Sequence, residues 1–109
     1  MQASDISYMA IPGIIRDWKQ QAITRSVLYL MKFKEDIKSK TNKREFVMAR
    51  NIVGYMLAKN GFTHTQIADQ VGRNRTTVIH GLKSLKNEMQ TDFDVRNEVK
   101  RIEIFLNQK

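Results

Sequence analysis

Cysteine is absent from the 109-residue chain, and proline occurs only once. A chain without cysteine has no disulfide framework, no thiolate zinc site and no cysteine nucleophile. Its two histidines, His64 and His80, are too few for a metal site without carboxylate help, and neither has a carboxylate or serine partner at a recognisable spacing. We therefore expect no metal, no cofactor and no enzymatic activity.

Long apolar runs are also missing. No stretch approaches the roughly 18 apolar residues of a membrane-spanning helix. Asp5, Pro12 and Arg16 interrupt the region where a secretory signal would need an apolar centre. The glycines lack the spacing of a Gly-x-x-x-x-Gly-Lys phosphate loop. We expect a cytoplasmic protein that binds neither membrane nor nucleotide.

Acidic residues are the minority charge. The chain has 11 Asp and Glu against 19 Lys and Arg, which gives a net charge of +8. Residues 25–59 carry a net +6 and residues 60–90 a net +2, whereas both ends are neutral. A basic run alone is more often a solvated surface, but an excess confined to one region is typical of a protein that binds a polyanion.

The few glycines and the near absence of β-branched alternation predict an all-α fold of a single domain. Helices are expected at about residues 14–38, 45–60, 63–71, 74–90 and 94–107. Residues 25–109 form the predicted domain, and residues 1–24 are expected to be an N-terminal extension, a packing helix or a dimer contact. The aromatic residues expected in the core are Trp18, Tyr29, Phe33, Phe46 and Phe105.

Residues 63–85 have the spacing of a helix-turn-helix unit. Thr63 and Gln66 form a capping-box pattern, and Gly72 supplies the positive φ of the turn that follows. Asn74 can cap the second helix by accepting a hydrogen bond from a backbone N–H of its first turn. The N-terminus of such a second helix faces outward, where it can enter the major groove of DNA.

The start of this second helix reads Arg73, Asn74, Arg75, Thr76 and Thr77. A cation in the first turn of a helix opposes the macrodipole, so folding alone gives little reason for Arg75. Contact with a phosphate or a guanine would explain an arginine at this position, because arginine can donate to guanine O6 and N7 together. Threonine offers a hydroxyl for a phosphate or base and a methyl for the thymine methyl. For Asn74 a purely structural capping role is an equally good explanation, and His80 is expected to be structural.

Residues 72–80 read GRNRTTVIH and closely resemble the signature Gly-Arg-Asp-His-Thr-Thr-Val-(Ile/Leu)-His of the C-terminal DNA-binding domain of DnaA, the bacterial chromosomal replication initiator. The resemblance continues upstream through residues 36–44 and 49–52, where that family has a basic loop followed by Pro-Arg-Gln and an apolar position. It covers roughly residues 29–106 and is more specific than a general helix-turn-helix pattern.

The resemblance implies a Trp-repressor-like helical bundle that binds double-stranded DNA by two routes. A basic loop that includes Lys40, Lys43 and Arg44 would reach a minor groove and the flanking phosphates. Arg50 and Asn51 match positions that contact phosphate. The positions that read bases and backbone in the major groove correspond to Arg73, Asn74, Arg75, Thr76 and Thr77.

The chain departs from the family pattern in three ways. One glycine precedes Arg73 where the family usually has two, so we expect a tighter turn. Asn74 and Arg75 replace the family's Asp-His pair, and we expect a guanine opposite Arg75. The basic loop contains fewer arginines than the family's loop, and lysine offers charge without the planar fork of arginine.

These observations predict a sequence-specific module that binds double-stranded DNA and acts in replication initiation control or transcriptional regulation. The alternative is a protein-interaction adaptor that retains the fold and docks on a replication or transcription protein. An adaptor has no need to confine the basic excess to residues 25–90, so the charge distribution favours DNA binding. The sequence leaves open whether a second copy of the chain, or a replication or transcription protein, is a further partner.

Overall fold

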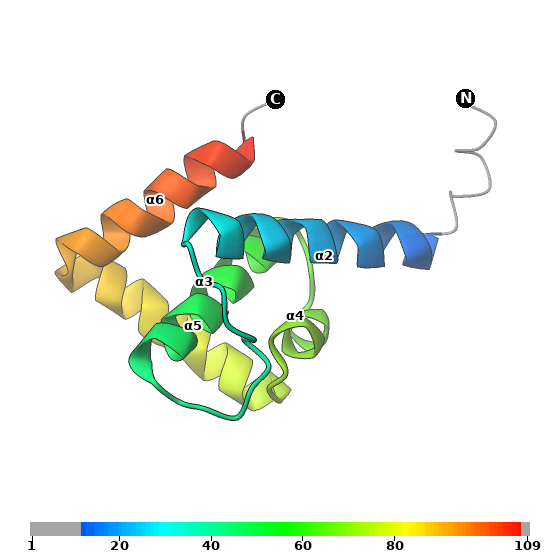
Figure 1. Cartoon of the computed structure of the whole chain (residues 1–109), viewed down its shortest axis with the longest axis horizontal. Helices are drawn as coiled ribbons and strands as arrows, with labels where there is room; N and C mark the ends of the chain where they lie inside the picture. Colours follow the sequence, from blue (N-terminus) through cyan, green and yellow to red (C-terminus); the bar gives the residue numbers. More distant parts are fainter. Residues whose placement is uncertain (1–11, 108–109) are drawn as a thin grey trace.

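The computed structural model describes residues 12–107, with side chains described from residue 18 onward. Within this range the chain forms five α-helices and no strand (Figure 1). The helices are α2 (Pro12–Leu30), α3 (Arg44–Lys59), α4 (His64–Val71), α5 (Arg75–Thr91) and α6 (Phe93–Asn107). None of these helices is long and apolar enough to span a membrane. The predicted all-α class, a helical bundle containing a helix-turn-helix, is confirmed.

The prediction of one helix over residues 14–38 is wrong at its C-terminal end, because α2 ends at Leu30. Lys32 has a left-handed backbone conformation with φ of 58°, and an α-helix cannot continue through it. The N–H of Phe33 reaches back to the carbonyl of Leu28 at 2.9 Å, which is the bond of a Schellman motif that closes a helix. The helix therefore ends eight residues earlier than the apolar pattern indicates.

Residues 31–43 form a loop whose apolar side chains explain this error. Ile37 is buried, and the ring of Phe33 meets that of Phe46 edge to face with centroids 5.0 Å apart. Apolar side chains thus anchor the loop to the core at several points. In the sequence their spacing continues the apolar pattern of the preceding helix, which explains the overlong prediction.

The other four helices lie within one residue of their predicted ends, and the expected capping residues begin α4 and α5. The Gln66 N–H donates to Thr63 Oγ1 at 3.2 Å, and the Thr63 N–H donates to Gln66 Oε1 at 2.8 Å, so the capping box is formed. The Thr77 N–H donates to Asn74 Oδ1 at 2.8 Å. Gly72 has φ of 67°, as predicted. These local interactions determine where α5 starts.

Helix α3 lies at the centre of the bundle, where α2, α4 and α5 all pack against it (Figure 1). The fully buried side chains of the core include Ile52, Val53, Met56, Leu57, Ile67, Leu85 and Ile102. Helices α3 and α5 approach closely at Gly81, where an added Cβ would overlap the side-chain amide of Asn51. One face of α5 therefore packs closely against α3, and the opposite face of α5 is exposed to solvent.

Three of the five aromatic residues expected in the core are on the surface, so that prediction is wrong for them. Trp18 is 74% exposed, Tyr29 82% and Phe105 52%. Phe33 and Phe46 are half-buried, in agreement with the prediction. Helices α2 and α6 carry more apolar side chains than the core buries, so some of their large side chains face solvent.

The predicted boundary between residues 24 and 25 falls inside α2. Ile23 and Thr24, on the N-terminal side of that boundary, are buried in the bundle together with Val27 beyond it. Residues 1–11 lie outside the described residues, so the expectation of an extension or dimer contact there stays a prediction.

Candidate nucleic-acid interface

The first turn of α5 presents three polar side chains to solvent. Arg75, Thr76 and Thr77 are exposed, and among the side chains described, those of residues 18–107, Arg75 has no hydrogen-bond or ion-pair partner. Asn74 is also exposed and uses its carbonyl oxygen to cap the helix. The positive end of the helix dipole lies at the same place, so this end of α5 favours a negatively charged or electron-rich ligand.

The loop of residues 31–43 packs directly on the turn between α4 and α5. A Cβ added to Gly72 would lie 3.0 Å from Lys38 Cβ, so this close approach requires glycine as much as the positive φ does. Arg73 ties the two segments together. Its Nη2 donates to the carbonyls of Ser39 at 2.8 Å and Thr41 at 3.3 Å. The basic loop and the helix-turn-helix turn are therefore parts of one surface.

Arg50 of α3 lies under the same loop and is only 6% exposed. Its Nε donates to the carbonyl of Ile37 at 2.6 Å. Its Nη2 donates to the carbonyls of Ser39 and Thr41, at 2.8 Å each. Phosphate contact by Arg50 stays a prediction, and these bonds do not support it: the side chain shapes the loop from inside.

Two guanidinium groups, those of Arg50 and Arg73, thus share the same pair of loop carbonyls. Burial lowers the pKa of Arg50, and the positive charge of Arg73 lowers it further. Arginine nevertheless stays protonated near neutral pH because its ordinary pKa is so high. The carbonyl dipoles offset part of the repulsion between the two guanidinium groups, and a net positive charge remains beneath the loop.

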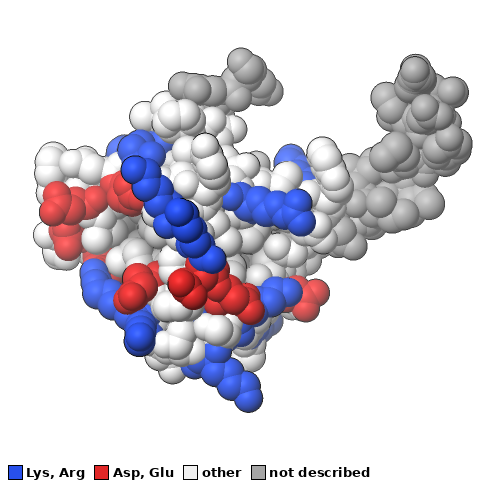
Figure 2. Space-filling view, in the orientation of Figure 1, with Lys and Arg blue, Asp and Glu red and all other residues white. Residues whose placement is uncertain are grey.

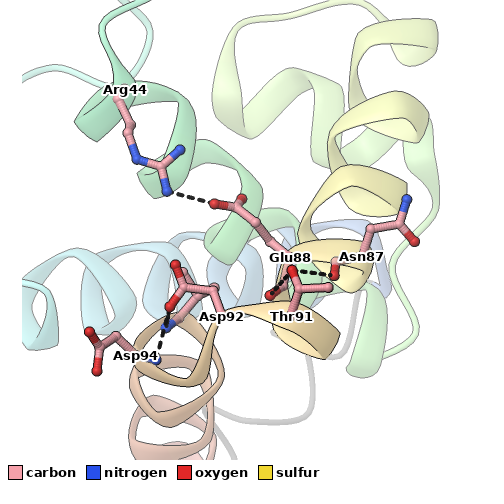
Figure 3. Close-up of polar contacts among 7 residues, drawn as sticks. Arg44, Asn87, Glu88, Thr91, Asp92 and Asp94 are labelled. Carbon is pink, nitrogen blue, oxygen red and sulfur yellow. Dashed lines mark hydrogen bonds and ion pairs between the residues drawn. The ribbon is translucent and has the colours of Figure 1, made fainter.

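Arg44, the first residue of α3, is exposed but already paired. Its Nη2 lies 2.6 Å from Glu88 Oε2 near the C-terminal end of α5 (Figure 3). This contact raises the pKa of Arg44. Asp92 and Asp94 lie close by and add further negative charge at that end of α5 (Figure 3). One terminal nitrogen of Arg44 is therefore engaged in an exposed ion pair, while the rest of the side chain faces solvent.

Of the remaining residues predicted to contact DNA, two are exposed to solvent and one lines a cleft. Lys40 and Lys43 are exposed on the loop, where they can reach phosphates. Asn51 is half-buried between α3 and α5 and lines a narrow cleft together with Arg73 and Thr77. The structure therefore joins Arg50 and Arg73 to the loop by hydrogen bonds, but it exposes only some of the predicted residues.

A further group of polar side chains lies along α5, and the sequence interpretation considered only His80 among them. His80, Lys83, Ser84 and Asn87 line one shallow depression on the surface of α5. His80 is exposed, which does not fit a packed role in the core. Positions 76, 80, 83 and 87 follow the helical repeat, so the spacing from Thr76 was the signal that could have identified them.

Charge alone does not outline the interface. On the face seen in Figure 2, lysine and arginine side chains alternate with acidic ones and do not form one continuous field. The distinguishing feature is instead the placement of exposed Arg75, Thr76 and Thr77 at a helix start, beside a lysine-bearing loop. An all-helical bundle that presents the second helix of a helix-turn-helix in this way is a helix-turn-helix DNA-binding domain.

Comparison with known proteins identifies the family. Residues 21–85 match the family described as bacterial DnaA protein helix-turn-helix, and the chain belongs to that family. It is 33% identical over 86 residues to the chromosomal replication initiator protein DnaA of Porphyromonas gingivalis, and 38% identical over 76 residues to that of Bacteroides thetaiotaomicron. No solved structure matches the chain. A helix-turn-helix domain of this family binds double-stranded DNA and is not catalytic by itself.

The matched regions make up 77% and 67% of this chain, but only 18% and 16% of the two initiators. The chain therefore spans less than a fifth of the length of these relatives, and it shares their helix-turn-helix region.

Proposed function

We propose that the chain binds a specific double-stranded DNA sequence by placing the start of α5 in the major groove. The observation that carries this proposal is the first turn of α5, where Arg75, Thr76 and Thr77 are exposed at the positive end of a helix dipole. Within residues 12–107 the Arg75 guanidinium has no protein partner, so both of its donor edges are available for a guanine or a phosphate. Family membership supports the same mode of binding.

The two arginines of the turn have different functions in this proposal. Arg75 reads a base, while Arg73 positions the basic loop, because the Arg73 donors are already bonded to loop and turn carbonyls. Arg50 supports the same loop from α3. Lys40 and Lys43 then reach the phosphates of the adjacent groove from a loop whose shape these arginines maintain.

Along α5, His80 and Lys83 extend the contact surface beyond the first turn. Both are exposed and follow Thr76 at intervals of four and seven residues, so they face the same side of the helix. Lys83 contributes a phosphate contact without sequence preference, and His80 is close enough to the helix start to touch the groove edge.

The cellular process is replication initiation control or transcriptional regulation at sites of the kind that initiators recognise. Support for replication comes from the relatives, which are chromosomal replication initiators. Transcriptional regulation rests on the general use of helix-turn-helix domains as repressors and activators.

Selection from a library of random duplexes at physiological salt tests the proposal. We expect enrichment of one short motif that contains a guanine at the position facing Arg75. A two-fold symmetric motif would indicate binding as a homodimer, and an asymmetric one binding as a monomer. Failure to enrich any motif, with equal affinity for all duplexes, would refute sequence-specific binding.

The second candidate is a protein-interaction adaptor, and one observation favours it: large apolar side chains are exposed on α2 and α6. The same selection separates the two candidates, because an adaptor that does not bind DNA enriches no duplex.

A further inference from the structure

A groove between α2 and α6 has an apolar floor. On one side of it lie Tyr29 and Leu30 of α2, and on the other Phe105 and Leu106 of α6. Tyr29 is 82% exposed and Phe105 52%, so two aromatic rings at one location face solvent. The same Tyr29 and Leu30 line an adjoining hollow that also includes Phe33, so the apolar surface continues around the end of α2. Monomeric proteins rarely leave such a patch uncovered unless something binds there.

The rim of this groove is basic. The charged residues that line the groove and the adjoining hollow are Arg25, Lys32, Lys34 and Arg101. Among the described lining residues none is acidic. Arg101 is balanced by Glu98 at 3.0 Å, but Arg25, Lys32 and Lys34 have no ion-pair partner among the side chains of residues 18–107.

Hydrogen bonds within the chain fix the shape of the groove, so it is formed before any partner binds. Arg101 Nη2 donates to the carbonyl of Leu30 at 2.8 Å, which joins α6 to the end of α2. The Schellman bond from Phe33 to Leu28 closes that end of the helix. A preformed groove lowers the entropic cost of binding because its walls are already ordered.

The groove also lies away from the proposed DNA-binding surface. In Figure 1 the end of α2 and the end of α6 are on one side of the bundle, and the start of α5 is on the other. DNA bound at the start of α5 therefore leaves the groove open.

We infer that this groove is a docking site for an acidic amphipathic helix of another protein. An amphipathic helix fits an apolar groove between two helices, with its anchors spaced three and four residues apart. Aromatic side chains such as Tyr29 and Phe105 are the usual centres of such interfaces. Aspartate and glutamate beside the anchors match the unpaired cations of the rim. A second copy of this chain is a poor occupant, because its matching face would bring basic rims together.

The test is a selection of random 16-residue peptides, displayed on phage, against the full chain. Enriched peptides are synthesised, and their affinity is measured for the parent chain and for a Tyr29→Ser, Phe105→Ser double variant. We expect enriched sequences to combine helically spaced apolar residues with Asp and Glu, and to bind the double variant at least about tenfold more weakly. Trp18→Ser is the matched control, since Trp18 is equally apolar and 74% exposed on α2 but does not line the groove.

Two further measurements make the result decisive. Lys34→Glu should weaken the acidic peptides by about threefold or more and strengthen versions in which Lys replaces Asp and Glu. Saturating duplex DNA should leave peptide affinity unchanged, and the double variant should keep the parent's DNA affinity and thermal midpoint. This inference does not depend on DNA binding, so it can fail or succeed separately from the proposed function.

The inference is overturned by any of three results: enriched peptides that lack acidic residues, peptides that bind the double variant as well as the parent, or an apolar face that proves to be occupied by a second copy or a lipid surface. Sedimentation of the chain at increasing concentration detects the second copy. Flotation with neutral and anionic vesicles detects the lipid surface.

Discussion

Arg73 and Arg75 are two residues apart in the chain, yet the structure places them in opposite environments. The Arg73 guanidinium is bonded to backbone carbonyls of the turn and the basic loop, whereas the Arg75 side chain is exposed and, within residues 12–107, unpartnered. Arg50 and Lys40 show the same contrast, since Arg50 is buried under the loop and Lys40 is exposed on it. A basic residue in a DNA-binding region can thus either shape the surface or contact the ligand, and the count of positive charges does not separate these functions.

The largest expected effect comes from removing a shaping residue. Arg50→Ala should lower the free energy of unfolding by about 2–4 kcal/mol, because it removes the donor to a buried carbonyl and leaves a cavity under the loop. Urea denaturation followed by circular dichroism measures this effect. Lys40→Ala, on the exposed side of the same loop, is the control and should unfold like the parent. Equal stability of the two variants would contradict the assigned role of Arg50.

DNA binding should separate the two arginines of the turn. Arg75→Ala should cost about 1–3 kcal/mol of binding free energy and relax the preference at one base position. Arg73→Ala should weaken all sequences by a similar factor, about 1 kcal/mol, and leave the base preferences intact because the loop is then less well placed. Duplex selection with each variant, followed by titration on matched and mismatched sites, measures both.

One outcome would reverse the roles assigned to Arg73 and Arg75. If Arg73→Ala changed the preferred base while Arg75→Ala did not, the reading residue would be Arg73 and its bonds to the loop carbonyls would have to break on DNA.

Substitutions at Asn74 should have a smaller effect, and they separate its capping role from a DNA contact. Asn74→Ala should lower stability by about 1 kcal/mol, because the Thr77 N–H loses its acceptor. Asn74→Asp, the residue of the family signature, restores the cap and should recover that stability, but it replaces the amide N–H donor with a carboxylate oxygen and should weaken binding to the duplex that the parent chain selects. Thermal unfolding and DNA titration of the pair distinguish the two contributions, and recovery of both properties by Asp would show that Asn74 acts only as a cap.

The smallest effect is expected at the ion pair between Arg44 and Glu88. Glu88→Gln should leave stability nearly unchanged, because exposed ion pairs contribute little. It should modestly increase DNA affinity at low salt, since Arg44 becomes available and one negative charge is lost. Titrations at two salt concentrations check this. An affinity that falls would indicate that the pair orients Arg44 toward the DNA.

Local signals in the sequence predicted the helix-turn-helix accurately. Its capping box, its glycine and its Asn74 cap act over three or four residues, so they can be recognised without the tertiary fold. The charge distribution located the basic excess, and the family resemblance added the expected DNA contacts of the basic loop, which stay predictions. The end of α2 was mispredicted because Lys32 takes a conformation that glycine usually supplies, and no glycine marks the turn.

Other features depend on which segments meet in space. Arg50 is buried because the carbonyls of residues 37, 39 and 41 converge on it, and no local pattern around position 50 indicates this. Likewise Tyr29 and Phe105 lie on helical faces that look like core in sequence, and only the packing of α2 against α6 shows that their rings remain outside.

The most direct test of DNA recognition is the salt dependence of binding to the selected duplex and to a scrambled one. With about six phosphate contacts, the logarithm of affinity should fall against the logarithm of salt with a slope of roughly −5 for both duplexes. At physiological salt the selected duplex should bind at least about a thousandfold more tightly than the scrambled one. A slope near zero, or equal affinity for both duplexes, would contradict sequence-specific binding through the start of α5 and the basic loop.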